Sequence, residues 1–254
     1  MSVNAKKLTG QVAVISGASK GLGKAMAMAL GAAGVKLALA SRDSTLLEKV
    51  AAEAKSVGTE VLVMKTDITS ESDVAQLASA VREKFGGVDI LINNAGVNVR
   101  KSVTEFTLEE WRLVMDTNLT GTFLACRAFV PLMKGRDGGR ILNLTSIMSH
   151  VALPGRTAYA ASKAGLLGFT KALALELAPE GINVVAISPG PFATEMNAPL
   201  MNNPELSAQF LSKIPLGRWG QPQEVAKLVV YLCSPEAAFI TGTDILMDGG
   251  WCAQ

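Results

Sequence analysis

The stretch that decides the fold runs Ser16-Gly17-Ala18-Ser19-Lys20-Gly21-Leu22-Gly23. An apolar run at residues 11–16, typical of a buried strand, precedes it, and an Ala/Met/Leu-rich helical pattern at residues 20–33 follows it. Its glycines permit positive φ and let the backbone approach another group closely. The start of the helix offers free N–H groups and a partial positive charge. The stretch therefore predicts a cradle for the pyrophosphate of a dinucleotide, contacted by Gly17, Ser19, Lys20, Gly21, Leu22 and Gly23.

Short apolar runs and longer helical patterns alternate along the rest of the chain. Further strands are predicted at residues 35–40, 60–65, 88–92, 139–144, 182–187 and 243–247. Helices are predicted at residues 43–57, 71–85, 108–133, 157–177 and 221–233. Continuous apolar runs are typical of parallel strands that are covered on both faces. We therefore predict an α/β Rossmann fold: a single domain over residues 1–254, whose doubly wound parallel sheet of about seven strands carries helices on both faces.

Composition argues against several classes of function. Hydrophobic residues make up 49% of the 254 residues and charged residues 18%, which is typical of a globular protein. The formal net charge is +2 and no Lys/Arg cluster stands out, so we expect no nucleic-acid partner. No apolar run approaches the ~20 residues of a membrane span, so we expect no membrane partner. Three scattered cysteines, a single histidine (His150) and no signal-peptide segment in residues 1–11 predict a cytoplasmic protein without a metal site.

The end of the second strand favours one cofactor. A site for NAD usually places an acidic residue there, to hold the ribose 2′-hydroxyl. Here the strand ends Ala40-Ser41-Arg42, and the first carboxylate is that of Asp43. Arg42 can form two hydrogen bonds to a 2′-phosphate, and Lys20 adds a second cation on the same side. We therefore predict NADP(H) as the cofactor, with Ser41 and Arg42 among its contacts.

A tyrosine and a lysine carry the predicted proton transfer. Tyr159 and Lys163 stand four residues apart in a helical pattern, so their side chains share one face. A nearby ammonium favours tyrosinate and lowers the phenol pKa from its usual ~10. Such a tyrosine is a general acid for reduction of a carbonyl and a general base for oxidation of an alcohol.

Further motifs stand in a fixed order around this pair. Asn93-Asn94-Ala95-Gly96 ends the fourth strand, and Asn118 follows in the next helical pattern. Ser146 lies thirteen residues before Tyr159, and Pro189-Gly190 ends the sixth strand with Thr194 four residues later. In all this the chain resembles the short-chain dehydrogenase/reductase family, in its form of about 250 residues, over residues 7–251. The position before Gly17, usually Thr in the family, is Ser16.

The resemblance assigns a role to each matched residue. Tyr159 exchanges a proton with the substrate oxygen, and Ser146 hydrogen-bonds that oxygen. Lys163 tunes the tyrosine and binds the nicotinamide ribose, while Asn118 holds a water that links Lys163 to solvent. The resemblance further implies cofactor contacts along the whole site, from Asp67, Ile68, Asn94, Ala95, Gly96, Tyr159, Lys163, Pro189, Gly190, Phe192 and Thr194. It also implies a homotetramer in which helices 108–133 and 157–177 form one interface and the C-terminal helix and strand the other. Trp251, near the end of the chain, fits a partner surface.

The sequence says less about the substrate. Residues 191–216 are predicted to form a lid, whose apolar and amide side chains favour a neutral or weakly polar carbonyl or alcohol. The lid and Gly217-Arg218-Trp219-Gly220 are similar to gluconate 5-dehydrogenases, while the rest is equally similar to 3-oxoacyl-carrier-protein reductases. In the latter a basic residue usually precedes the sixth strand, where this chain has Glu180, although Arg136 could still dock a carrier. His150 is expected to line the substrate pocket or to lie on its rim, without a catalytic role.

Plainer interpretations exist for each motif taken alone. The glycine stretch could be a tight turn, Lys20 and Arg42 could be solvated charges, and Asn118 could cap or kink a helix. A second class of function is a non-catalytic NADP-binding sensor or scaffold, which typically lacks the tyrosine or the lysine; this chain has both. A sugar epimerase or dehydratase is a weaker alternative, because those relatives carry a longer C-terminal part. The joint occurrence of the motifs favours the oxidoreductase.

Overall fold

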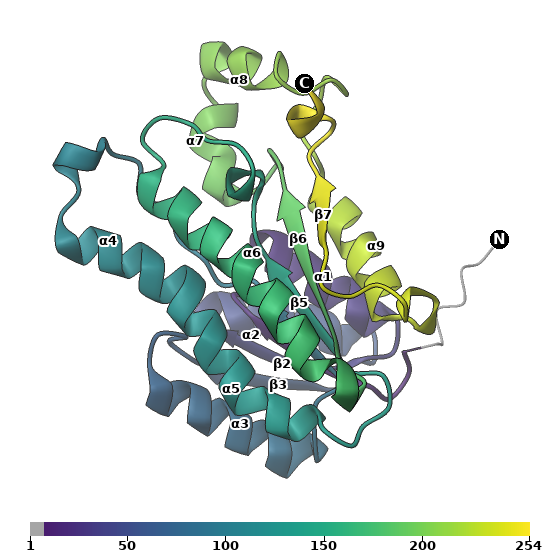
Figure 1. The fold of residues 1–254 in the computed structure, drawn as a ribbon. Helices are drawn as coiled ribbons and strands as arrows, with labels where there is room; N and C mark the ends of the chain where they lie inside the picture. Colours follow the sequence, from purple (N-terminus) through teal and green to yellow (C-terminus); the bar gives the residue numbers. More distant parts are fainter. Residues whose placement is uncertain (1–7) are drawn as a thin grey trace.

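The computed structural model describes residues 8–254, so part of the N-terminal stretch considered for a signal peptide, and Lys7 where the resemblance begins, lie outside it. Seven parallel strands form one sheet in the order β3-β2-β1-β4-β5-β6-β7 (Figure 1). The strands are β1 (Val12–Ser16), β2 (Lys36–Ser41), β3 (Val61–Lys65), β4 (Ile90–Asn93), β5 (Arg140–Leu144), β6 (Asn183–Pro189) and β7 (Asp244–Met247). The predicted doubly wound α/β fold is confirmed.

Helices cover both faces of the sheet (Figure 1). One face packs against α1 (Gly21–Ala32), α2 (Ser44–Ser56) and α9 (Pro222–Cys233). The other packs against α3 (Glu71–Phe85), α5 (Gly121–Met133) and α6 (Thr157–Leu177). Alternate residues of β1 enter the two cores, Ala13 and Ile15 the first and Val12 and Val14 the second. This is why the strand reads as a continuous apolar run.

The predicted helix 108–133 is not one regular helix. It consists of α4 (Leu108–Met115), a π-helical turn over Asp116–Thr120, and α5. The wider turn closes with a hydrogen bond from the Gly121 N–H to the Asp116 carbonyl, five residues back. Single π-helical turns are frequent at functional sites. Here the turn carries Thr117 and Asn118, both buried, on the side of the sheet's carboxyl edge.

The predicted lid contains two short helices, α7 (Ala198–Met201) and α8 (Pro204–Leu211). Phe210 of α8 stacks on Trp219, with ring centroids 5.9 Å apart, and also contacts Trp251 at 5.6 Å. Trp251 is therefore buried within its own chain, which corrects the expectation that it meets a partner surface. Aromatic rings from three separate segments thus hold the end of residues 191–216 against the C-terminus.

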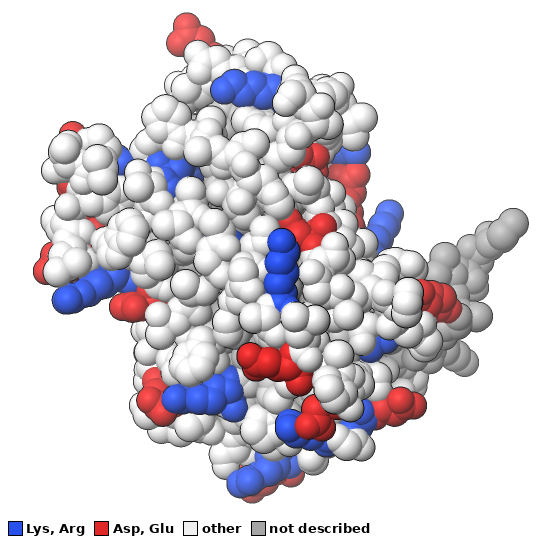
Figure 2. All heavy atoms as spheres, in the orientation of Figure 1, with Lys and Arg blue, Asp and Glu red and all other residues white. Residues whose placement is uncertain are grey.

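The surface carries both signs of charge. Figure 2 shows Lys and Arg side chains interspersed with Asp and Glu on the face over α5 and α6. Among the described residues, no helix is long and apolar enough to cross a membrane.

Gly23 provides a test of how the first turn is built. A Cβ on Gly23 would lie 2.2 Å from the Gly17 carbonyl oxygen, so we expect Gly23→Ala to lower the free energy of unfolding by about 1–3 kcal/mol. Gly168 of α6 has open space where its Cβ would be, so Gly168→Ala should raise that free energy by about 0.5–1 kcal/mol. Urea unfolding of both variants checks this; equal stabilities would contradict it.

Candidate active site

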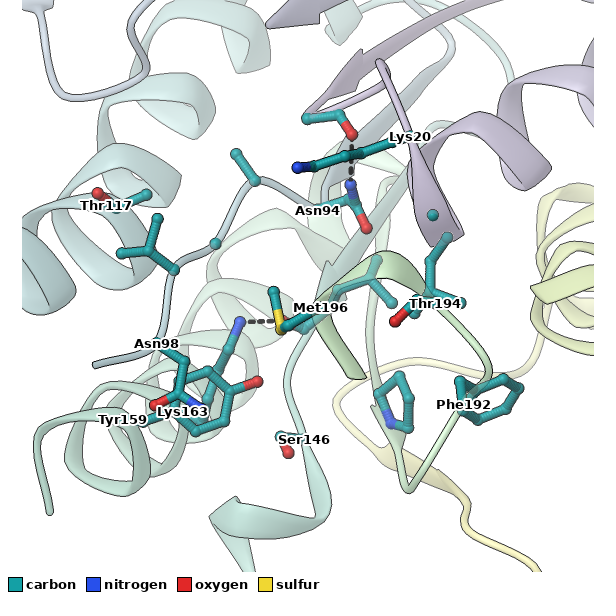
Figure 3. A pocket seen from close by; sticks show the side chains of 18 of the residues that line it. Lys20, Asn94, Asn98, Thr117, Ser146, Tyr159, Lys163, Phe192, Thr194 and Met196 are labelled. Atoms are coloured by element: carbon teal, nitrogen blue, oxygen red, sulfur yellow. Dashed lines mark hydrogen bonds between the residues drawn. The ribbon is translucent and has the colours of Figure 1, made fainter. Parts of the chain in front are cut away.

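Loops at the carboxyl ends of the parallel strands surround a cavity of about 450 Å³. Open α/β sheets bind their ligands at this edge. Figure 3 shows Lys20 and Asn94 at one end of the cavity and Tyr159 and Lys163 at the other, with Thr194 on the far wall. Every cofactor contact predicted from the sequence lines it, except Gly23. Of the four predicted catalytic residues, Ser146, Tyr159 and Lys163 line it and Asn118 does not.

The glycine turn is pressed against the end of β4. Gly17 has φ +65°, and a Cβ there would lie 2.9 Å from the Ala95 Cα. The Asn94 side-chain amide donates to the carbonyls of Ser16 and Gly17, both at 3.0 Å. In return the Ser16 hydroxyl accepts the N–H groups of Asn94 and Ala95, both at 3.1 Å. Serine thus provides the hydroxyl at the position where threonine is usual in the family.

The start of α1 fits a bound pyrophosphate. Lys20 is its N-cap but makes no side-chain capping bond, and the first turn holds no acidic residue. Gly21, with φ +55°, opens the helix and lines the cavity. Free N–H groups and the helix dipole therefore face the cavity without a competing carboxylate on the helix itself. Gly23 serves a different purpose from the predicted contact, because it packs against the Gly17 carbonyl behind the cavity.

The end of β2 presents cations rather than a free acid. Asp43, the carboxylate nearest to the strand end, caps α2 by accepting the Leu46 N–H at 2.9 Å. The Ser41 hydroxyl donates to the Ser19 hydroxyl at 3.0 Å, which ties the strand to the glycine turn. Lys20 and Arg42 are exposed, and neither forms an ion pair with any of residues 8–254. The two side chains are therefore available to an anionic ligand.

Lys163 is buried at the other end of the cavity. Its side-chain nitrogen donates to the Leu144 carbonyl at 2.6 Å and lies 5.7 Å from the centre of the Tyr159 ring. Burial lowers the pKa of Lys163 to about 8. The lysine can therefore change its protonation state near neutral pH, which an exposed lysine cannot.

Tyr159 departs from expectation in one respect. Burial raises the pKa of its phenol above the usual value, against the lowering effects of the Ser146 hydroxyl and the charges of Arg156 and Arg100. The prediction that Lys163 lowers this pKa is wrong for the protein without ligand. The ammonium lies over the face of the ring and binds a carbonyl, so it does not offset the loss of solvent around the phenol. At neutral pH the tyrosine holds its proton, as a general acid must.

Asn118 acts as a clamp behind the cavity. Its side chain is fully buried, donates to the Val97 carbonyl at 3.0 Å and accepts the Val97 N–H at 2.8 Å. It also donates to the Ser162 hydroxyl at 2.9 Å. The side chain thus joins the segment after β4 to α6, next to Lys163. That it holds a water stays a prediction.

A second cluster of buried side-chain amides is not predicted from the sequence. Asn93 donates to the Asn143 side-chain oxygen at 2.8 Å, and Asn143 donates to the Thr170 hydroxyl at 2.9 Å. This chain of buried hydrogen bonds joins β4, β5 and α6, and so fixes the strand ends relative to Tyr159. The sequence contains one signal for this cluster: Asn93 and Asn143 stand at the ends of two apolar strands, and buried amides need hydrogen-bond partners.

Two further residues are placed differently from the sequence-based expectation. His150 does not line the cavity; its Nε2 lies 2.5 Å from the Asp244 carboxylate of β7. Arg156, three residues before Tyr159, is not predicted from the sequence as a site residue, yet it lines the cavity. Its sequence context holds no motif that could have drawn attention to it.

Comparison with known proteins gives the family. The family model described as enoyl-(acyl carrier protein) reductase matches residues 17–252. The chain belongs to the short-chain dehydrogenase/reductase family. It is therefore an oxidoreductase that acts on CH–OH and C=O groups with a nicotinamide cofactor.

Its relatives carry several specific activities. The chain is 42% identical to a 3-oxoacyl-[acyl-carrier-protein] reductase of Synechocystis sp., over 96% of this chain and 97% of that protein. It is 39% identical to a trans-4-hydroxycyclohexanecarboxylate dehydrogenase of Sinomonas cyclohexanicum, over 98% and 96%. A protein of Agrobacterium tumefaciens assigned as a gluconate dehydrogenase superposes with a TM-score of 0.95 at 35% identity, covering 99% of both chains.

The buried Lys163 provides a pH-dependent stability test. The pKa of Lys163 is about 8 in the folded protein and about 10.5 in the unfolded chain. Below pH 8 the lysine is charged in both states, and the full cost of burying that charge lowers the free energy of unfolding. This cost falls as the pH rises from 8 to 10.5, because the folded protein loses the proton first. Relative to Lys163→Met, the unmodified protein should therefore gain about 2 kcal/mol of unfolding free energy between pH 7 and pH 9.5. Urea unfolding of the cofactor-free proteins measures this.

Lys171, exposed on the same helix, supplies the control. Lys171→Met should show no such pH-dependent difference. A difference for Lys163→Met that stays constant with pH would mean that the lysine is not desolvated in solution.

Proposed function

We propose that the protein is an NADP(H)-dependent oxidoreductase that interconverts the carbonyl and secondary alcohol forms of a free small molecule. The observation that carries this proposal is the shared cavity: the glycine cradle and the Tyr159, Ser146 and Lys163 side chains line one continuous space. A scaffold that only binds nucleotide has no need for a proton donor, a hydrogen-bond donor and a buried lysine at the far end. Residues 191–216 serve as the lid over that end.

Tyr159, Ser146 and Lys163 each have a separate role in the proton transfer that accompanies hydride transfer. When bound, the nicotinamide supplies the hydride to the carbonyl carbon, or accepts it in the reverse direction. Tyr159 donates the proton to the carbonyl oxygen, and the Ser146 hydroxyl stabilises the charge that develops there. Lys163 returns a proton toward Tyr159, a role that its pKa of about 8 supports. Gly17, Gly21 and the start of α1 hold the pyrophosphate.

NADP is favoured over NAD by the free cations at the adenosine end. Lys20 and Arg42 line the cavity without partners among residues 8–254, and Asp43 is engaged in capping α2. A ribose 2′-phosphate would meet two positive charges there, whereas a 2′-hydroxyl would find the nearest carboxylate occupied.

A free substrate is favoured over a carrier-bound one. Glu180 stands where carrier-protein reductases usually have a cation, and it accepts a 2.7 Å ion pair from Lys134. Arg136, the alternative docking cation, binds the Asp89 carboxylate through two nitrogens, at 2.6 and 2.9 Å. The position before β6 thus offers no cation, and the charge of Arg136 is neutralised within the chain. The names of the cyclohexanecarboxylate and gluconate relatives point to free alicyclic or sugar acids as the substrates to try first.

We further propose a cytoplasmic homotetramer. Phe123 of α5 and Leu175 of α6 are exposed on one face, and Tyr231, Phe239 and Leu246 are exposed around α9 and β7. These are the two surfaces that family members use for assembly, and exposed apolar side chains grouped in this way are typical of interfaces.

Replacing the proton donor tests the catalytic proposal. Tyr159→Phe should lower kcat by at least about 100-fold with any carbonyl substrate, because the proton has no other donor at that position. It should leave NADPH affinity within about threefold. NADPH absorbance with a panel of cyclic ketones and keto acids measures turnover, and fluorescence titration measures binding.

Tyr231→Phe, which changes the other tyrosine of the chain, is the control and should keep full activity. Tight NADPH binding without turnover of any panel member would instead favour the sensor or scaffold.

Charge reversal tests the cofactor preference. The protein should bind NADPH at least about tenfold more tightly than NADH, equivalent to about 1.4 kcal/mol. Arg42→Asp should abolish or reverse this preference, because a carboxylate repels the 2′-phosphate and accepts from a 2′-hydroxyl. Arg82→Asp, an exposed charge reversal on α3, should not change the ratio. Equal affinities for both cofactors in the unmodified protein would contradict the roles given to Lys20 and Arg42.

A further inference from the structure

One charged side chain of the cavity has no role in the chemistry described so far. Lys20, Arg42, Asp43 and Asp67 belong to the adenosine end. Glu195 lies against the glycine turn, since its carboxylate oxygen would be 3.4 Å from a Cβ on Gly21. Lys163 is bound to the Leu144 carbonyl. Arg156 remains, at the end that holds Tyr159 and Ser146.

Arg156 is a half-buried cation without a partner. Its guanidinium makes no hydrogen bond and no ion pair with any of residues 8–254. The other arginines removed from solvent are satisfied: Arg140 donates to three carbonyls, including Leu232 at 3.2 Å, and Arg136 binds Asp89. A guanidinium that loses water and gains no acceptor costs free energy, and structures keep such a group where a ligand provides the acceptor.

The surroundings of Arg156 are positive. Arg156 is the N-cap of α6, and the preceding Gly155 carbonyl accepts the Lys101 N–H at 3.2 Å. This bond brings the segment that carries Arg100 next to Arg156. Burial lowers the pKa of Arg156 most, and the positive charge of Arg100 lowers it further. The Glu110 carboxylate is bound to Lys101, and no carboxylate of residues 8–254 affects the pKa of Arg156. A negatively charged group would therefore be attracted to this end of the cavity.

The walls of the cavity around Tyr159 are apolar. Met148, Leu153, Phe210 and Trp251 line them, and the last two rings contact each other at 5.6 Å. Arg156 caps α6 three residues before Tyr159, and it is close enough for its charge to lower the pKa of the Tyr159 phenol, although burial raises that pKa more. A ligand whose carbonyl reaches Tyr159 thus has room for a short hydrocarbon part and a second polar group near Arg156.

We propose that Arg156 binds a carboxylate of the substrate, so that the protein acts on compact keto acids and the corresponding hydroxy acids. This inference rests on the proposed oxidoreductase function and names its substrate class. A guanidinium matches a carboxylate with two parallel hydrogen bonds, which fixes orientation as well as position. In reduction, the ketone carbon gains the hydride from NADPH, the ketone oxygen gains the proton of Tyr159, and NADP⁺ leaves. The carboxylate itself is unchanged.

Paired substrates test this assignment. The probes are 4-oxocyclohexanecarboxylate and 5-oxohexanoate, each compared with its methyl ester, which keeps the ketone and removes the charge. With NADPH, kcat/KM for each acid should exceed that for its ester by about 10- to 100-fold, the range expected for a charged hydrogen-bonded pair. Arg156→Gln should remove most of that ratio and Arg156→Lys should restore part of it. Arg82→Gln, an exposed control on α3, should leave the ratio unchanged.

A binding measurement gives a readout apart from turnover. Cyclohexanecarboxylate, which has no ketone to reduce, should raise the Tm of the NADPH complex, whereas cyclohexanecarboxamide should not. Arg156→Gln should abolish the shift.

The possible failures can be told apart. Esters reduced as fast as acids, or an acid-to-ester ratio that survives Arg156→Gln, would overturn the role of Arg156 and leave the oxidoreductase intact. No oxidation of NADPH with any acid or ester would contradict the proposed function itself, and the inference with it.

Discussion

The close contact between the glycine turn and the end of β4 is the constraint on which the site depends. Gly17 leaves no room for a side chain against Ala95, and Gly23 leaves none against Gly17. Asn94 and Ser16 close this contact with four hydrogen bonds. Because the strands are parallel, the turn that results stands at the same edge as the ends of β2, β5 and β6. The glycine turn and Tyr159 therefore line one cavity.

Burial gives the two ends of this cavity different electrostatic properties. At the adenosine end, Lys20 and Arg42 are exposed and can meet a phosphate with little loss of solvent. At the catalytic end, burial lowers the pKa of Lys163 to about 8 and raises that of Tyr159. Tyr159 therefore holds its proton at neutral pH, as the proposed role of general acid requires. Arg156 adds a half-buried positive charge to that end, so in our proposal α6 and its N-cap supply both the proton and the group that orients the substrate.

The sequence predicts what short-range patterns determine. The strands, most helices and the order of Gly17, Ser146, Tyr159 and Lys163 follow from local periodicity and motifs, and the fold is confirmed. The π-helical turn at Asn118 and the burial of Trp251 depend on contacts between distant segments, which no local pattern contains. The direction of the Tyr159 pKa shift depends on how much solvent the cavity removes, which spacing does not reveal. Arg156 lies outside residues 191–216, whose composition favours a neutral or weakly polar substrate.

A crystal structure of the complex with NADPH tests the shared cavity most directly. We expect the pyrophosphate against the N–H groups at the start of α1 and the 2′-phosphate between Lys20 and Arg42. We expect the nicotinamide within reach of Tyr159 and Ser146, with room left beside Arg156. A 2′-phosphate that contacts neither cation, or a nicotinamide outside the space lined by Tyr159 and Ser146, would contradict this account.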